Sequence, residues 1–237
     1  MAGGNVRHKV TASVRYNFTL AFLTLSLFVR CNNYDLVAKL ENPSPGETFT
    51  DRFYAFVSSW QTTGDMANQP YAECSSLTGL SKVDCACTKA AAAGNLRKHS
   101  NHEFKAFLGL AGSPAYNPPC RSVGYPAGCS TNIAATWYNT RDGVLFNTHT
   151  PSSFSTALQN PIKFTEQKAD INSGTVWTGS SALGGHTNQC PGEWTIADAT
   201  TVNVGDLAQS STAWEFNGST QACNTQARIY CFATSPP

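Results

Sequence analysis

Nine cysteines constrain this chain of 237 residues more than any other feature. Cys31 directly follows an apolar run, and the other eight are spread over the rest of the chain. An even number of cysteines behind an export signal indicates a disulfide framework formed in an oxidising compartment. The rival interpretation is a thiolate zinc site built from the four cysteines between positions 85 and 129, but the Cys-x-x-Cys spacing that zinc sites favour is absent. The eight cysteines are Cys74, Cys85, Cys87, Cys120, Cys129, Cys190, Cys223 and Cys231.

The N-terminal segment predicts export. Residues 1–17 carry three basic side chains and no acidic one, and residues 18–29 form an apolar run that ends at Arg30-Cys31. This order is typical of a secretory signal, and the run is shorter than the roughly 20 apolar residues of a membrane-spanning helix. A cysteine in this place resembles the lipidated cysteine of bacterial lipoproteins, although Arg30 stands where such signals prefer a small residue. We therefore expect lipidation of Cys31, with a soluble secreted form as the alternative.

The sequence divides into three parts. Residues 1–30 are the predicted signal peptide, and residues 31–50 are polar, contain Pro43 and Pro45, and predict a tether. Residues 51–234 are the predicted domain, in which aromatic and β-branched content rises from Phe53 onward. We expect the mature protein on the cell surface or outer membrane through its lipid anchor, or secreted.

Charge excludes some partners. Charged residues make up 13% of the chain, and 16 basic against 15 acidic residues give no excess that would indicate nucleic-acid binding. Removing residues 1–30 takes away four basic residues and no acidic one, which leaves a net charge of −3. A mildly acidic surface disfavours anionic lipid or heparin as the main partner.

The predicted fold class is α+β, with mostly short antiparallel strands and one main helix. The helix is expected over residues 82–96, where four consecutive alanines are stopped by Gly94-Asn95. Strands are predicted where short aromatic or β-branched runs lie between Gly, Pro, Asn and Ser. They are residues 53–59, 103–108, 134–138, 144–146, 175–178, 213–216 and 227–232.

The order of these segments resembles the C-type-lectin-like domain of leptospiral surface lipoproteins and, more distantly, the endostatin domain of collagens. The resemblance covers roughly residues 53–233. It is carried by the ordered set FVSS (56–59), AAAAGNL (90–96), FKAFL (104–108), Trp137, Asn160-Pro-Ile162, Thr165-Glu166, VWTGS (176–180), Cys190 near Trp194, and Cys223-x7-Cys231.

The endostatin resemblance implies a nested pair of disulfides, Cys87–Cys231 around Cys190–Cys223. Four cysteines are extra to that pattern. Their proximity in sequence suggests Cys74–Cys85 and Cys120–Cys129, although eight cysteines allow 105 connectivities.

The candidate sites are few. The sugar-binding C-type lectins hold calcium with Glu-Pro-Asn or Gln-Pro-Asp, and neither tripeptide occurs here. The acidic residues Glu193, Asp198 and Asp206 are scattered, so we expect no cofactor, with calcium as the disfavoured alternative. His99, His102 and His186 fall in predicted loops, and no catalytic motif is present. Trp137 and Trp177 are expected in the core, whereas Trp214 is predicted to be partly exposed and is the candidate ligand contact.

The expected function is therefore binding rather than catalysis. The resemblance implies a surface lipoprotein that adheres to host matrix or plasma proteins, or to a glycan. The first alternative is a secreted or periplasmic enzyme on the same scaffold that uses free, reactive thiols. The second is a lipoprotein with a purely structural role in the envelope.

Overall fold

The computed structural model describes residues 52–96, 103–110, 136–146, 157–181 and 187–234. Residues 50–237 form one compact unit, and the predicted signal peptide and tether lie outside the described residues. No helix in those described ranges is long and apolar enough to cross a membrane. The elements are β1 (Phe53–Val57), η1 (Ala72–Cys74), α2 (Gly79–Ala93), β2 (Phe104–Ala106), β3 (Trp137–Asn139), β4 (Val144–Phe146), β5 (Thr175–Trp177), α4 (Pro191–Trp194), β6 (Thr201–Asp206), η4 (Thr212–Trp214), β7 (Ser219–Ala222) and β8 (Arg228–Ala233).

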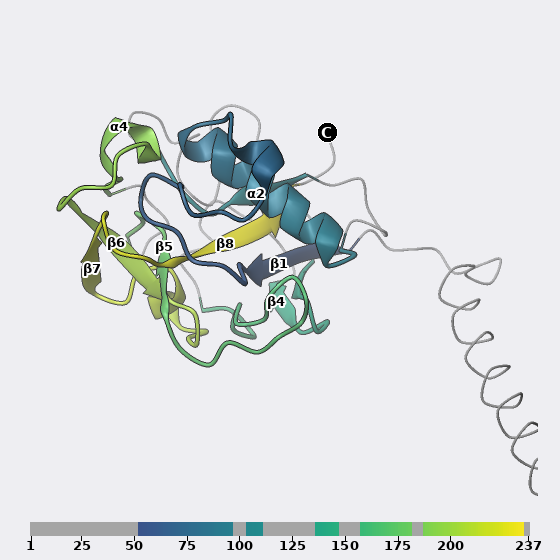
Figure 1. The fold of residues 1–237 in the computed structure, drawn as a ribbon. Coiled ribbons are helices and arrows are strands. Elements are labelled where there is room, and N and C mark those ends of the chain that lie inside the picture. The colour runs from purple at the N-terminus through teal and green to yellow at the C-terminus, as the bar shows by residue number, and fades with distance from the viewer. Residues whose placement is uncertain (1–51, 97–102, 111–135, 147–156, 182–186, 235–237) are drawn as a thin grey trace, which may run out of the picture. The chain divides into compact units, whose positions relative to one another are not determined.

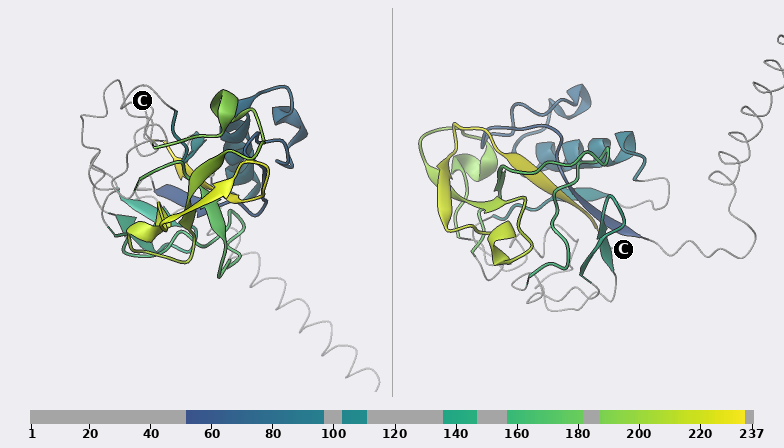
Figure 2. Two further views of the ribbon diagram at one scale, coloured as in Figure 1. Left: turned by 90° about the vertical axis from the view of Figure 1, so that its left-hand side faces the viewer. Right: turned by 90° about the horizontal axis from the view of Figure 1, so that it is seen from below.

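The strands form one mixed sheet in the order β4-β3-β1-β8-β5-β6-β7, with β2 also paired to β8. Most neighbours are antiparallel, as the sequence predicted, but β1 pairs with β3 and β5 pairs with β8 in parallel. The predicted α+β class, with one main helix and mostly antiparallel strands, is thus confirmed. The two parallel strand pairs were not predicted. Figure 1 shows α2 above β1 and β8, with β5, β6 and β7 at the other end of the sheet. The right-hand view of Figure 2, seen from below, shows the same separation.

Helix α2 buries one apolar face. The buried residues Val83, Ala86, Cys87, Ala90 and Ala91 follow the spacing of a single helical stripe. The helix begins three residues before the predicted start and ends at Ala93, where Gly94 donates its N–H to Ala90 O and closes the last turn. A Cβ on Gly94 would lie 2.1 Å from Glu166 O, so the helix end approaches the 163–171 segment too closely for any side chain.

The core is rich in aromatic rings. Trp137, Trp177 and Trp194 are fully buried, as expected for the first two. Each of these indole N–H groups donates to a backbone oxygen: Trp137 to Ala233, Trp177 to Thr62 and Trp194 to Gly109. A buried indole N–H that lacks a partner costs stability, so these three bonds stabilise the core.

Three disulfides tie the elements together. Cys87 of α2 joins Cys231 of β8, Cys190 joins Cys223, and Cys74 joins Cys85. The first two are the nested pair that the endostatin resemblance implied, and the third is the local pair suggested by sequence proximity. Gly64 covers Cys190–Cys223 so closely that a Cβ there would lie 2.2 Å from Cys190 Sγ.

One strand prediction was wrong, and two strands were missed. Residues 213–216 are not a strand, because Ser211 Oγ accepts the N–H of Ala213 and starts the 3-10 turn η4. Strands β6 and β7 were not predicted. Val202 and Val204 of β6 alternate and were the available signal, whereas β7 contains no large apolar residue and exists because it pairs with β6.

Candidate binding surface

The turn between β3 and β4 presents charged side chains from a fixed backbone. Asn139 Oδ1 accepts the N–H groups of Arg141 and Gly143, both at 3.0 Å. Asp142 takes a left-handed conformation with φ 63°, which an Asp-Gly turn tolerates well. Arg141 and Asp142 are therefore held exposed at the tip of a tight hairpin.

A second turn, residues 163–171, faces the first. Thr165 Oγ1 accepts from Gln167 N at 3.3 Å and from Ala169 N at 3.1 Å. Thr165 N donates to Ala169 O at 2.9 Å, and Ile171 N donates to Lys163 O at the same distance. These bonds close the turn locally, so its exposed side chains project from a defined backbone.

The 163–171 turn is also anchored to the sheet. Val57 N at the end of β1 donates to Phe164 O at 3.1 Å. The carboxylate of Glu166 is fully buried and accepts both the N–H and the hydroxyl of Ser59. Burial of the Arg228 guanidinium lowers the pKa of Arg228. The negative charge of the nearby Glu166 carboxylate opposes this shift but is the smaller effect. A buried, hydrogen-bonded carboxylate thus fixes the base of the turn.

Arg141 joins the two turns. Its Nε and Nη2 both donate to Lys168 O, at 3.1 and 2.9 Å. The guanidinium carbon lies 4.3 Å from the centre of the Phe164 ring, which is a cation–π distance. Thr140 Oγ1 adds a bond of 2.9 Å to Thr165 O. The guanidinium is therefore held in one orientation from two directions.

Lys163 contacts the same aromatic ring. Its Nζ lies 5.3 Å from the centre of the Phe164 ring and 3.1 Å from Asp170 Oδ2. Two cations therefore flank one phenyl ring on this side of the surface.

Arg52 extends the group of cations toward β1. Its Nη1 lies 2.8 Å from Asp142 Oδ1, which also accepts the Tyr54 hydroxyl at 3.0 Å, and its guanidinium lies 5.3 Å from the centre of the Tyr138 ring. Hydrogen bonding with the Tyr54 side chain, followed by the attraction of Tyr54 and Asp142, raises the pKa of Arg52, and burial raises the pKa of Tyr54. We call Arg52, Arg141, Lys163 and Lys168, with the rings of Tyr138 and Phe164, the cationic surface.

The cationic surface concentrates positive charge in an otherwise acidic domain. The described residues contain eight Arg and Lys against eleven Asp and Glu, and four of those eight cations belong to this surface. Only Asp142 and Asp170 are ion-paired with it in the described part of the chain. This grouping could not be predicted from the sequence, because its cations come from positions 52 to 168 and the net charge sums over the whole chain.

Trp214 is not the exposed contact that the sequence predicted. Its side chain is fully buried and lies 4.9 Å from the Phe107 ring and 5.6 Å from the Tyr230 ring, between ring centres. The physical reason is that residues 212–214 form the 3-10 turn η4, which places the indole in the core and not on the surface. Gly205 of β6 also packs directly on the backbone of Trp214, where a Cβ would lie 1.9 Å from its carbonyl oxygen.

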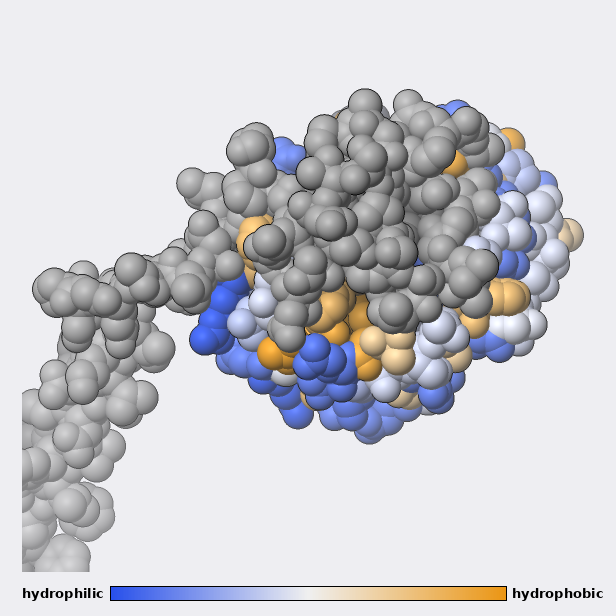
Figure 3. Space-filling view, turned by 180° about the vertical axis from the view of Figure 1, so that it is seen from behind, coloured by the Kyte–Doolittle hydropathy of each residue, from blue (hydrophilic) through white to orange (hydrophobic). Residues whose placement is uncertain are grey.

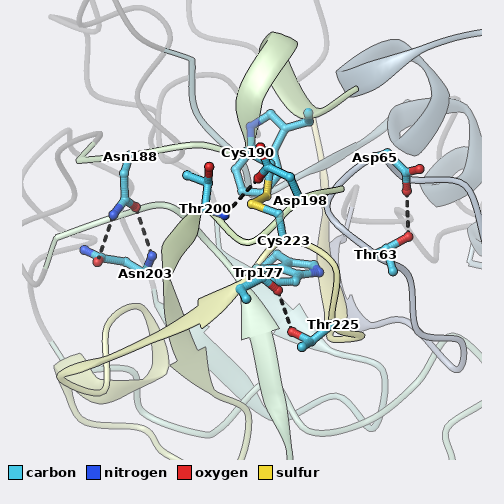
Figure 4. Close-up of a disulfide and its surroundings, with 12 residues drawn as sticks. Thr63, Asp65, Trp177, Asn188, Cys190, Asp198, Thr200, Asn203, Cys223 and Thr225 are labelled. Carbon is cyan, nitrogen blue, oxygen red and sulfur yellow. Dashed lines mark hydrogen bonds between the residues drawn. A yellow bond between two sulfur atoms is a disulfide. The ribbon is translucent and has the colours of Figure 1, made fainter. Parts of the chain in front are cut away.

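The surroundings of Cys190–Cys223 are polar but already satisfied (Figure 4). Asn188 Oδ1 accepts the N–H of Asn203 at 2.9 Å, and Asn188 Nδ2 donates to Asn203 Oδ1 at 3.3 Å. Asp198 Oδ1 accepts from Thr200 N at 2.8 Å. Among the described residues, no three His, Cys, Asp or Glu side chains lie together in a way that would hold a metal ion.

Deeper in the same region, Ser180 donates its hydroxyl to the fully buried carboxylate of Glu215, and Thr178 Oγ1 donates to Glu215 O at 2.7 Å. These contacts fix the segment that follows β5. They are internal to the fold and present no accessible group.

Several predicted residues lie outside the described residues: Cys31, His99, His102, Cys120, Cys129 and His186. The large hydrophobic side chains exposed in the described ranges are Leu77 and Ile196. Figure 3, the view from behind, shows a mainly hydrophilic described surface with a small group of hydrophobic residues near its middle. The cationic surface is therefore the feature that best suits a binding role.

Comparison with known proteins adds no family assignment. No protein-family model matches the chain, and no curated protein sequence matches it. The candidate function therefore depends on the residues themselves.

Proposed function

We propose that this chain is an exported, C-type-lectin-like binding module, held to the membrane by a lipid on Cys31 and used for adhesion to host matrix or plasma proteins or to a glycan. The observation that carries the proposal is the cationic surface, in which Arg141 is fixed by Lys168 O and the Phe164 ring. A side chain that is already ordered loses little rotamer entropy when a partner binds. Exposed, ordered Arg and aromatic groups are what macromolecular interfaces favour.

The disulfides support the exported location and oppose the thiol-enzyme alternative. Disulfide frameworks persist in oxidising compartments, which agrees with the predicted signal peptide. All six cysteines in the described ranges are in disulfides, so that part of the chain offers no thiolate for catalysis. The nested pairing is the one that the endostatin resemblance implies, and it supports the C-type-lectin-like and endostatin-like fold assignment.

The test is a binding screen with the oxidised, exported protein against arrays of matrix proteins, plasma proteins and glycans. The matched control is the same protein reduced and alkylated, and a parallel screen contains a metal chelator. We expect saturable binding that survives the chelator and is lost on reduction. Absence of binding, or free thiols in the denatured mature protein, would overturn the proposal, and binding that the chelator abolishes would show a calcium site instead.

A further inference from the structure

The cationic surface also indicates what kind of partner binds. We propose that it docks an acidic segment of a partner protein, with a carboxylate placed against Arg141 and aromatic or aliphatic groups against Phe164 and Tyr138. This inference rests on the proposed binding function and adds the chemistry of the partner to it.

The geometry of Arg141 suits a carboxylate. A guanidinium has five N–H donors in a planar fork, and two nitrogens of Arg141 are engaged by one acceptor, Lys168 O. Donors on the other edge remain for a ligand, and a carboxylate pairs with such an edge through two parallel hydrogen bonds. Phe164 supports one face of the fork at 4.3 Å, so the donor plane is set before the partner arrives.

The mixture of charge and aromatic surface favours a protein over a polyanionic chain. Affinity for a polyanion grows with the number of its charges that the protein neutralises. Here two of the four cations are already paired, Arg52 with Asp142 and Lys163 with Asp170. A uniformly negative chain would be repelled by the carboxylates of Asp142 and Asp170, whereas a peptide can place neutral or hydrogen-bonding groups beside them.

The wider charge distribution points the same way. The described residues carry eleven acidic against eight basic side chains, and four of those eight basic side chains belong to this surface. Screening limits the reach of such a local field to about 8 Å at physiological ionic strength. A short acidic segment can lie wholly within that reach, whereas most of a long polyanion extends beyond it.

The experiment measures binding of three probes to the oxidised full protein by fluorescence anisotropy. The probes are a short labelled peptide of alternating Glu and Tyr, the matched peptide with Gln in place of Glu, and labelled heparin chains. We expect the Glu-Tyr peptide to bind more tightly than the other two and to weaken as salt is added.

The variants locate the site. Arg141→Ala is expected to weaken Glu-Tyr binding roughly tenfold, the loss typical of a central Arg in an interface. Lys163→Ala is expected to weaken it by a smaller factor, and Lys82→Ala is its matched control. Lys82 lies in the first turn of α2, whereas the cationic surface adjoins the other end, which is about 18 Å away at the helical rise per residue. Arg141→Lys keeps the charge without the fork and should bind nearly as weakly as Arg141→Ala.

Other outcomes overturn the inference. It fails if the Glu-Tyr peptide does not bind, if Arg141→Ala binds it as the wild type does, or if heparin alone shows Arg141-dependent binding. The array distinguishes these failures from failure of the proposed function. An array partner that binds Arg141→Ala normally leaves the binding function intact and sinks only the acidic-segment inference, whereas an array without any partner sinks the function itself.

Discussion

Removing the Cys87–Cys231 disulfide is expected to cost more stability than removing any other described bridge. The two cysteines are 144 residues apart, against 33 for Cys190–Cys223 and 11 for Cys74–Cys85. When a disulfide is removed, the unfolded chain gains an entropy that grows with the logarithm of the loop length. For these three loops the corresponding losses of unfolding free energy are about 5, about 4 and about 3 kcal/mol at 25 °C. The long bridge also joins α2 to the central strand β8, both at fully buried positions.

The assay is guanidinium denaturation of the double variant Cys87→Ala/Cys231→Ala under non-reducing conditions, followed by tryptophan fluorescence. The control is Cys74→Ala/Cys85→Ala, which removes a bridge and two sulfur atoms in the same way but frees a short loop. We expect the free energy of unfolding to fall by about 2 kcal/mol more in Cys87→Ala/Cys231→Ala than in Cys74→Ala/Cys85→Ala. The slope of the unfolding free energy against guanidinium concentration should also be steeper in Cys87→Ala/Cys231→Ala, because its unfolded chain exposes more surface. Equal losses in the two variants would refute the loop-entropy reasoning.

Three further substitutions test the packing. Trp214→Ala should cost about 3–5 kcal/mol in thermal or chemical unfolding, with no loss of partner affinity where the variant is folded, because the indole is in the core. Gly64→Ala should cost about 1–3 kcal/mol, since the new methyl group would overlap Cys190 Sγ; unchanged stability would contradict the close approach. Burial raises the pKa of the Tyr230 hydroxyl well above 10.0. The contribution of Tyr230 to stability should therefore be fully present below pH about 10 and fall above it, because there the hydroxyl ionises in the unfolded chain but not in the folded one. Tyr230→Phe should flatten that alkaline decline in a pH series of melts.

The main helix and several strands could be predicted because their residues carry a local signal. The alanine run 90–93, stopped by Gly94-Asn95, predicted α2, and β-branched or aromatic runs predicted β1, β4 and β8. Strand β7 could not be predicted, because its residues form a strand only through pairing with β6. Trp214 was predicted to be partly exposed because its segment precedes the Cys223 loop, whereas the segment forms the 3-10 turn η4 and the indole is buried.

The cationic surface could not be predicted at all. Arg52 and Arg141 are separated by 89 positions, and what brings them together is the parallel pairing of β1 with β3. A parallel pair requires a long connection, and no short-range pattern announces it. Net charge pointed away from an anion-binding role because it sums over the chain, whereas binding depends on the few cations that share one surface.

Hydrogen–deuterium exchange of the protein with and without its array partner tests the central claim most directly. The amides of the two turns, residues 139–143 and 163–171, should exchange more slowly in the complex, and the amides of η4 around Trp214 should not change. The Arg141→Ala variant at the same partner concentration should lose most of the protection in both turns. Protection confined to other segments, with the two turns unchanged, would contradict the claim that this surface carries the binding function.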